Sequence, residues 1–432
     1  MYKREALRIQ ENGHLTIGGC DAVKLAQQYQ TPLYVMDEQT IRNNCRLYRD
    51  SIDQFYEGRG LVLFASKAFS AKEMYRIAME EGLGADVVSG GELFTALSVN
   101  FPVEKIYFHG NNKTRSELEM AVSAGVGHIV VDNLEELELL DQIAGTAGVK
   151  QRVMFRIKPG VEAHTHEFIR TGHIDCKFGV ALENGEALDF AKKIKGKNNL
   201  ELRGIHCHIG SQIFDEKPFL LAAERMMDFA AQIQDVLGIS IKEINLGGGF
   251  GIRYTDKDHP LAYQEYMAGI AAEMKRIASQ RGMELPFVLL EPGRSIVGEA
   301  GVTLYTVGSV KEIPGVRTYV SVDGGMVDNP RYILYQAEYE MLLANKADQP
   351  KNSCVTVAGK CCETGDLLGE NIKIQTPCAG DTLAVLSTGA YNYSMASNYN
   401  RIPRPPVVMV NNGTSRLVVR RESYEDLVRN DL

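Results

Sequence analysis

Residues 61–70, LVLFASKAFS, begin with a continuous apolar run and end with small residues around one lysine, Lys67. A short apolar run of this kind is typical of a strand buried on both faces, as in parallel sheets. An ammonium group at the end of such a strand must be paired, neutralised or bonded covalently, because a desolvated lone charge is costly. Lys67 is therefore either a lysine that extends to solvent or one that forms a Schiff base.

Strand-like and helix-like segments alternate along the chain after this run. Segments such as GADVV, KIYFHG and HIVVD are separated by helical patterns with short connections. Counting from residue 61 to the segment FVLLEPG gives about eight strands, the number that closes a (β/α)8 TIM barrel. An open doubly wound sheet is the alternative, and the lack of a dinucleotide fingerprint after the first strand favours closure.

The pattern changes from about residue 302 onward. Segments such as VTLYTVGSV, RTYVSVDGG and TLAVLSTG follow one another without regular helices, which predicts an all-β domain of the Greek-key barrel kind. Two strand-like pieces near the N-terminus, HLTIGGC and TPLYVMD, precede the barrel and are expected to join this domain. The predicted domains are a cofactor-binding barrel over residues 38–301 and a β domain from residues 1–37 and 302–432.

Composition excludes several functional classes. The chain of 432 residues is 44% hydrophobic and 24% charged, which is ordinary for a globular enzyme. A net charge of −8 without a basic face argues against nucleic acid as a partner. No apolar run reaches the roughly 18 to 20 residues of a membrane span, and the polar start is unlike a signal peptide, so the cytoplasm is the expected location. The eight cysteines lack CxxC spacing, so we expect reduced thiols and no metal site.

Polar residues follow nearly every strand of the predicted barrel. In such barrels the site lies at the carboxyl ends of the strands. One polar residue at a strand end means little, but a polar residue at almost every end is difficult to explain by solvation alone. The residues at these positions are Lys67, Asp86, Ser89, His109, Asn111, Asp132, Arg156, His206, His208, Ser211, Gly247, Gly248, Gly249, Glu291 and Arg294.

Two of these segments suggest a phosphorylated cofactor. In NLGGGFGI, residues 245–252, three glycines between a strand and a helix expose backbone N–H groups that can surround a phosphate, although a simple tight turn is the alternative. In EPGR, residues 291–294, Glu291 is either the partner of Arg294 or a buried functional carboxylate. A Schiff-base lysine, a phosphate loop, a histidine and a carboxylate together suit pyridoxal 5'-phosphate. A lysine aldolase would not need the carboxylate.

The motifs as a set resemble the diaminopimelate decarboxylase family, a barrel class of pyridoxal-phosphate decarboxylases. The resemblance covers nearly the whole chain, and its first motif has serine before Lys67 and phenylalanine after Ala68, where ALKAN is commoner. The motifs are FASKAFS, GADVVSGGE, FHGNNK, HCHIGSQ, NLGGGFGI, EPGRS, VDGGMVDNPR, GKCCETGD, GAYNYSMASNYN and RIPRPP.

The resemblance implies a role for each matching residue. Lys67 corresponds to the Schiff-base lysine, His208 to the histidine that stacks on the cofactor ring, and Glu291 to the partner of the ring nitrogen. Further cofactor-binding positions are Asp86, Ser211, Gly247, Gly248, Gly249, Gly293, Arg294 and Tyr391. Positions that correspond to substrate contacts are Arg294, Arg331, Tyr335, Glu363 and Tyr391, while Cys362 corresponds to the catalytic acid and Cys361 is expected to be structural.

The implied reaction is the decarboxylation of meso-2,6-diaminopimelate to L-lysine and carbon dioxide, the last step of lysine biosynthesis. Ornithine and lysine end in a bare ammonium, whereas diaminopimelate ends in a second amino-carboxylate that requires an arginine as well as an acid. Arg294 and Arg331 can bind the distal carboxylate, and Glu363 the distal ammonium. The resemblance also implies a homodimer with shared active sites.

Two other functions are compatible with the same fold. A racemase related to alanine racemase has an arginine at the ring nitrogen, so Glu291 argues against that class. A non-catalytic cofactor-binding protein would need neither Cys362 nor the two arginines. Carbon dioxide release from diaminopimelate distinguishes these alternatives from the decarboxylase.

Overall fold

The computed structural model describes residues 6–161 and 176–432. The loop with His164 and His166, whose closure over the site the sequence leaves open, lies outside the described residues. The chain forms two compact units. The β unit contains Met1–Asn43, Ile252–His259 and Arg294–Leu432, and the barrel unit contains Asn44–Gly251 and Pro260–Gly293. The domain boundaries derived from the sequence, 38–301 against 1–37 and 302–432, stay a prediction.

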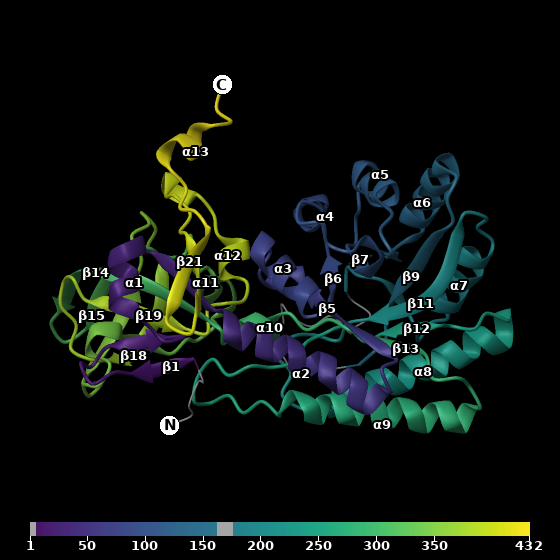
Figure 1. Ribbon diagram of the computed structural model, residues 1–432, viewed down its shortest axis with the longest axis horizontal. Helices are drawn as coiled ribbons and strands as arrows, with labels where there is room; N and C mark the ends of the chain where they lie inside the picture. Colours follow the sequence, from purple (N-terminus) through teal and green to yellow (C-terminus); the bar gives the residue numbers. More distant parts are fainter. Residues whose placement is uncertain (1–5, 162–175) are drawn as a thin grey trace. The chain divides into compact units, whose positions relative to one another are not determined.

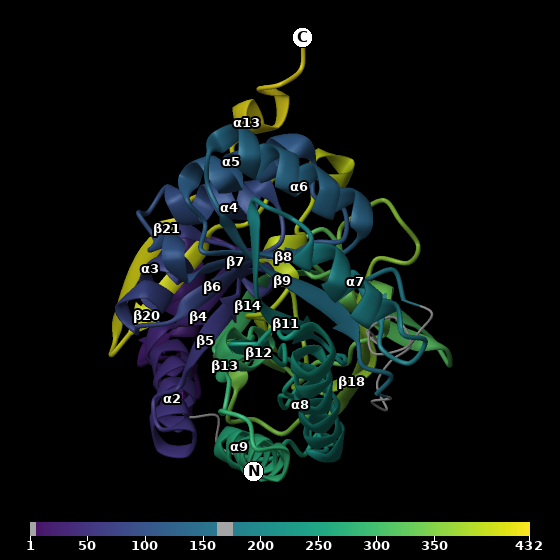
Figure 2. The same cartoon turned by 90° about the vertical axis from the view of Figure 1, so that its right-hand side faces the viewer.

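The barrel unit is a closed parallel sheet, which confirms the predicted (β/α)8 fold. Within the described residues, eight strands pair in the order β5-β6-β7-β8-β9-β11-β12-β13, and β13 pairs with β5 to complete the ring. Figure 1 shows the barrel strands from the side, and Figure 2 labels them around the ring. The strands are β5 (Gly60–Ala65), β6 (Gly84–Val87), β7 (Ile106–Phe108), β8 (His128–Val131), β9 (Gln151–Lys158), β11 (Leu200–Cys207), β12 (Glu243–Asn245) and β13 (Phe287–Leu290), and the short β10 (Val180–Ala181) pairs with β9.

Helices surround the barrel strands on the outside (Figure 2). Their ends are set by local capping: α5 begins at a capping box of Thr114 and Glu117 and ends at Gly125 in the left-handed conformation. The helices are α3 (Lys72–Glu80), α4 (Gly90–Leu97), α5 (Arg115–Ala124), α6 (Leu134–Ala147), α7 (Glu186–Lys195), α8 (Lys217–Leu237) and α9 (Tyr263–Arg281), and α2 (Glu38–Tyr56) runs from the β unit into the barrel unit. No described helix has both the length and the apolar character needed to cross a membrane.

The barrel interior is packed with side chains. One buried cluster combines side chains from five different strands, and its members are Leu63, Tyr107, Val130, Met154 and Leu289. The Tyr107 ring stacks on His128 with centroids 4.3 Å apart, and Glu243 lies 3.2 Å from His128. The barrel is therefore a core that fixes the strand ends in place, as expected for this fold.

The β unit is mostly sheet and is built around β14, which pairs with β15, β19 and β4. It is a separate, mostly β domain as predicted. Its helix α1 corresponds to the helical pattern DAVKLAQQY of the sequence, whereas its other α-helices are only four or five residues long and were not revealed by the sequence pattern. Its strands are β1 (Leu7–Ile9), β2 (Leu15–Ile17), β3 (Cys20–Asp21), β4 (Leu33–Asp37), β14 (Gly301–Ile313), β15 (Arg317–Val322), β16 (Met341–Leu343), β17 (Ser353–Ala358), β18 (Leu367–Ile374), β19 (Thr382–Leu386), β20 (Val407–Asn411) and β21 (Thr414–Val419). Its helices are α1 (Ala22–Tyr29), α10 (Arg294–Val297), α11 (Arg331–Tyr335), α12 (Asn392–Met395) and α13 (Tyr424–Val428).

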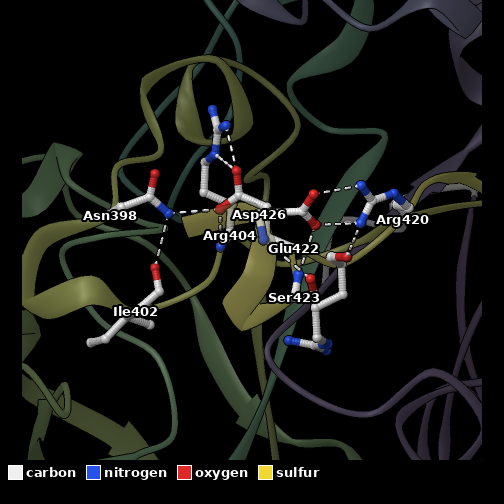
Figure 3. Close-up of polar contacts among 8 residues, drawn as sticks. Asn398, Ile402, Arg404, Arg420, Glu422, Ser423 and Asp426 are labelled. Carbon is white, nitrogen blue, oxygen red and sulfur yellow. Dashed lines mark hydrogen bonds and ion pairs between the residues drawn. The ribbon is translucent and has the colours of Figure 1, made fainter. Parts of the chain in front are cut away.

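Polar contacts attach the C-terminal segment to the β unit (Figure 3). Asn398 donates to Glu422 at 2.6 Å, and the Arg404 guanidinium donates to the other oxygen of Glu422. Arg420 pairs with Asp426, which also caps α13 together with Ser423. These contacts fix the segment that follows β21.

A buried ion pair lies beside strands β7 and β8 of the barrel. Lys113 Nζ donates to Glu136 Oε1 at 2.7 Å and to the carbonyl oxygens of Val130 and Gly110. The side chains of Lys113 and Glu136 are only 1% and 3% exposed. Removing one partner would leave the other charge buried without compensation.

We expect Glu136→Leu to lower the free energy of unfolding by about 3 to 5 kcal/mol, because Lys113 keeps its desolvation cost and loses its counter-charge. The double variant Lys113→Met with Glu136→Leu should recover most of this loss. Chemical denaturation measures both. Glu119→Gln is the control, because Glu119 and its partner Arg115 are 53% and 58% exposed and the change should be small. Equal losses in Glu136→Leu and the double variant would contradict the prediction.

Candidate active site

Lys67 lies in a tight turn directly after strand β5. The turn is a 3-10 helix, Ser66–Ala68, in which Ser66 and Ala68 are buried while Lys67 is exposed. Ser66 Oγ donates to Glu92 Oε2 at 2.7 Å, and the same carboxylate oxygen accepts the N–H of Val88 at 2.8 Å. Glu92 thus fixes the turn to the end of β6, and Lys67 presents a reachable amine at the carboxyl end of its strand.

Glu291 follows β13 and is buried among hydrogen-bonding side chains. Asn245 Nδ2 donates to Oε1 at 2.6 Å, and His109 Nε2 lies 2.8 Å from the same oxygen. His206 Nε2 lies 3.3 Å from Oε2, and the rings of His109 and His206 meet edge to face with centroids 4.6 Å apart. Three strand ends therefore hold one carboxylate from different sides.

These contacts determine the charge of Glu291. Burial by itself would raise the pKa of Glu291, but His109 and His206 outweigh this effect and hold the pKa well below its ordinary value. Burial lowers the pKa of His206 to about 3, so His206 is neutral and its Nε2–H can donate to the carboxylate. Glu291 is therefore a buried anion at neutral pH.

A second carboxyl group, that of Asp86 in β6, lies in the same region, near His109. Its Oδ1 lies 3.8 Å from His109 Nε2 and has no hydrogen-bond partner among the described residues. Burial raises the pKa of Asp86 to about 7, in opposition to the nearby charge of His109. The buried group formed by His109, His206 and Glu291 also has metal-ligand spacing, since its ligand atoms lie within 4.8 Å of one another, but direct contacts between imidazole and carboxylate explain that proximity.

The glycine loop after β12 tolerates no side chain. A Cβ on Gly247 would meet the Cys207 carbonyl oxygen at 2.7 Å, and one on Gly248 would meet the Glu291 carbonyl oxygen at 2.1 Å. Gly249 has a φ of +114° and would meet the Gly210 carbonyl oxygen at 2.4 Å. The backbone of the loop therefore packs against the strand ends on both sides. A simple tight turn, the alternative given by the sequence, would not require such close packing.

The loop after β11 lies beside the glycine loop. Gly248 N donates to His208 Nδ1 at 3.3 Å, and Ile213 N donates to the Gly249 carbonyl at 3.0 Å. This brings the segment with Ser211 next to the glycines. Burial, together with the positive charges of Lys67 and Arg156, lowers the pKa of His208 well below its ordinary value, so this imidazole is neutral.

In the β unit, two buried arginines share one tyrosine hydroxyl. Arg331 Nη1 donates to Tyr254 Oη at 3.0 Å and to Tyr339 Oη at 2.6 Å, and Arg294 also donates to Tyr254 Oη. The Arg294 guanidinium lies 4.8 Å from the Tyr391 ring centroid, and the Arg331 guanidinium lies 5.9 Å from the centroids of Tyr391 and Tyr335. The structure thus gathers Arg294, Arg331, Tyr335 and Tyr391 into one cluster. Phenol groups orient these guanidinium groups without neutralising them.

The vicinal cysteines belong to the β unit and differ in their surroundings. Cys361 is buried, and burial raises its pKa to about 12, which is consistent with a structural thiol. Cys362 is exposed, and its N–H donates to Asn400 Oδ1 at 2.7 Å. Glu363 is also exposed. Lys67 belongs to the other unit, so neither unit contains all the residues selected from the sequence.

The sequence motifs missed three residues that the structure places in these clusters. Asn245 binds Glu291, while Tyr254 and Tyr339 bind Arg331. Asn245 had a detectable signal, because it is a polar residue in the otherwise apolar end of a strand directly before the glycines. Tyr254 and Tyr339 had none, since isolated tyrosines are common in any core.

The parallel barrel, the lysine after its first strand and the ionised carboxylate after its last are features of the barrel class of pyridoxal-dependent decarboxylases. Residues 38–298 match the family described as "Pyridoxal-dependent decarboxylase, pyridoxal binding domain". Curated relatives and a solved structure identify the family more closely.

The chain is 51% identical over 435 residues to the diaminopimelate decarboxylase of Bacillus subtilis (strain 168), with 100% of this chain and 98% of the relative covered. It is 51% identical over 422 residues to that of Bacillus methanolicus, with 98% of each covered. The crystal structure of diaminopimelate decarboxylase from M. jannaschii in complex with L-lysine superposes with a TM-score of 0.93 at 36% identity and covers 100% of this chain and 99% of that one. The chain belongs to the diaminopimelate decarboxylase family.

The raised pKa of Asp86 predicts a pH-dependent stability. The folded chain keeps the Asp86 proton up to about pH 7, whereas the unfolded chain releases it near about pH 4. Because the unfolded state then binds fewer protons, the contribution of Asp86 to the free energy of unfolding falls as the pH rises through this window. Asp86→Asn cannot titrate.

We therefore expect the free energy of unfolding of the wild type, minus that of Asp86→Asn, to decrease between pH 5 and pH 8 when the cofactor-free chain is unfolded in urea. The exposed Asp53 provides the control, since Asp53→Asn should give a difference that hardly changes with pH. A difference for Asp86→Asn that rises with pH would show that the folded state ionises this group readily.

Proposed function

We propose that this chain is a carboxy-lyase that converts meso-2,6-diaminopimelate to L-lysine and carbon dioxide with pyridoxal 5'-phosphate as cofactor. The observation that carries the proposal is the buried Glu291 carboxylate at the end of β13, whose contacts with Asn245, His109 and His206 favour its ionised form. A carboxylate in this state is what a protonated pyridine nitrogen needs as its partner. The names of the relatives and their full-length similarity support the same reaction.

The residues of the barrel unit fit the cofactor. The glycine loop packs so closely on the neighbouring strand ends that a Cβ on any of its three glycines would meet a backbone carbonyl oxygen, and Asp86 Oδ1 is a buried acceptor with no described partner. Gly293 packs so closely on the lysine turn that a Cβ would meet the Ala65 carbonyl oxygen at 3.0 Å. The residues of the barrel unit proposed to hold the cofactor are Lys67, Asp86, His208, Ser211, Gly247, Gly248, Gly249, Glu291 and Gly293. Arg294 and Tyr391 of the β unit are also proposed to bind it.

When bound, the cofactor supplies a ring that accepts the electrons left behind as carbon dioxide departs. Glu291 accepts a hydrogen bond from the ring nitrogen and so holds a proton on that atom. His208 is neutral and packs on the ring without adding charge. Lys67 would supply the amine that holds the cofactor covalently, and Cys362 is the proposed donor of a proton to the α-carbon of the substrate.

The arginine and tyrosine cluster supports a substrate with a second carboxylate. Arg331 remains charged, and its described hydrogen bonds go to tyrosine hydroxyls, so it keeps its capacity to bind a carboxylate. We propose that Arg294, Arg331, Tyr335 and Tyr391 contact the substrate and that Glu363 binds its distal ammonium. Lysine and ornithine lack the distal carboxylate and would make no use of this capacity of Arg331.

We further propose a cytoplasmic homodimer whose active sites combine both chains. Cys362 and Glu363 are exposed in the single chain, whereas a proton donor and a substrate-binding carboxylate work best when water is excluded. A second copy that covers this face would provide that exclusion. The free thiols of all eight cysteines are consistent with a reducing compartment.

The experiment that tests the function is carbon dioxide release by the purified, cofactor-loaded protein. We expect release from meso-diaminopimelate with L-lysine as the product, and little release from lysine or ornithine. Lys67→Ala is the control and should release none, while borohydride should link the cofactor permanently to the Lys67 peptide of the wild type only. Release from lysine or ornithine but not from diaminopimelate would refute the substrate assignment.

Mixed refolding tests the shared site. Lys67→Ala and Glu363→Ala chains are each expected to be inactive, but a mixed dimer places both defects in one site and leaves the other intact. With random pairing, roughly a quarter of wild-type activity should return. If mass spectrometry confirms mixed dimers and no activity returns, the residues do not come from different chains.

A further inference from the structure

Asn245 connects two parts of the proposed cofactor site, the Glu291 carboxylate and the glycine loop. Its side chain is completely buried, with an exposed fraction of 0%. Nδ2 donates to Glu291 Oε1 at 2.6 Å, and Oδ1 accepts the N–H of Gly247 at 2.9 Å. One amide therefore binds both the carboxylate assigned to the ring nitrogen and the first residue of the glycine loop.

A backbone hydrogen bond closes these contacts into a ring. Glu291 N donates to the Gly247 carbonyl at 2.7 Å. The ring thus runs from Glu291 to Gly247 through the backbone, from Gly247 to Asn245, and from Asn245 back to the Glu291 side chain. Gly248 packs against the Glu291 carbonyl so closely that no Cβ fits between them. A shift of Glu291 would therefore break a hydrogen bond that holds the glycine loop, and a shift of the loop would break one that holds Glu291.

The ring also fixes which way the amide faces. A backbone N–H can only donate, so the atom of Asn245 that faces Gly247 must be the oxygen. The NH2 group then faces Glu291 and needs an acceptor, which an ionised carboxylate always provides. Asn245 thus favours the anionic form of Glu291 and a single orientation of the Glu291 oxygens. The amide of Asn245 itself does not titrate.

We propose that Asn245 is a positioning residue that holds Glu291 and the glycine loop in one arrangement, so that the ring-nitrogen end and the phosphate end of the cofactor site depend on a single side chain. The inference rests on the proposed function, because it assigns those two ends to pyridoxal phosphate. It predicts that one substitution weakens the binding of both halves of the cofactor.

Two probes and two variants of the cofactor-free full chain test this inference. Inorganic phosphate probes the glycine loop, and pyridoxal, which lacks the phosphate, probes the ring end. Asn245→Leu has a similar volume and loses both hydrogen bonds. Asn245→Asp keeps an oxygen that accepts the N–H of Gly247. It can donate a hydrogen bond to Glu291 only while one proton is shared between the introduced carboxyl group and that of Glu291.

We expect Asn245→Leu to bind each probe about tenfold more weakly than the wild type at every pH, as the loss of a buried hydrogen bond implies. Asn245→Asp should match the wild type near pH 6 and weaken toward pH 9, because its proton is lost and a second charge appears beside Glu291. The other charged or titratable groups near Glu291 are His109, His206, Arg156 and Asp86, and Asp86 has a pKa of about 7 that lies within this range. A comparison with the wild type at each pH removes their contribution. Ile244→Val is the control, since Ile244 is a buried neighbour on the same strand.

Several results would overturn the inference. One is that Asn245→Leu weakens only one probe, or weakens neither more than Ile244→Val does. Another is that Asn245→Asp, shown to be folded by circular dichroism, binds the probes weakly at every pH. If Asn245→Leu fails to fold, the pH series of Asn245→Asp still decides. A wild-type chain that binds neither probe would refute the cofactor assignment itself, which distinguishes that failure from a failure of the positioning role.

Discussion

The carboxylate of Glu291 is buried and yet ionised, and the proposed chemistry depends on this condition. A lone buried carboxylate would take up a proton, because burial disfavours the charged form. Here a donor from Asn245 and the imidazoles of His109 and His206 stabilise the anion. Their positions are fixed by β12, β7 and β11, so the closed barrel is needed to assemble the group.

The two units contribute different kinds of chemistry. The barrel unit supplies an amine, a glycine loop and a fixed negative charge at the strand ends. The β unit supplies fixed positive charge, since Arg294 and Arg331 share the hydroxyl of Tyr254. A racemase-like site with an arginine at the ring nitrogen would need no buried anion at Glu291, so the buried carboxylate agrees better with the proposed decarboxylase than with a racemase.

The sequence predicted the barrel and the mostly β domain because apolar runs and short connections impose these folds locally. It also selected Lys67, Glu291 and the glycine loop, because a polar residue at a buried strand end is conspicuous. Their roles stay predictions. The hydrogen-bonded ring through Asn245 and the tyrosine contacts of Arg331 could not be predicted, because they join residues that are distant in the sequence through side-chain geometry. The helices of four or five residues in the β unit were not predicted, because a single turn has no periodicity.

The most direct measurement is the charge of Glu291 itself. Infrared difference spectra between the wild type and Glu291→Gln, recorded at neutral pH with carbon-13 labelled glutamate, isolate the bands of this one group. An ionised Glu291 predicts that the difference contains carboxylate stretching bands that shift with the label. A labelled band of a protonated carboxylic acid, assigned to Glu291 by its loss in Glu291→Gln, would contradict the account.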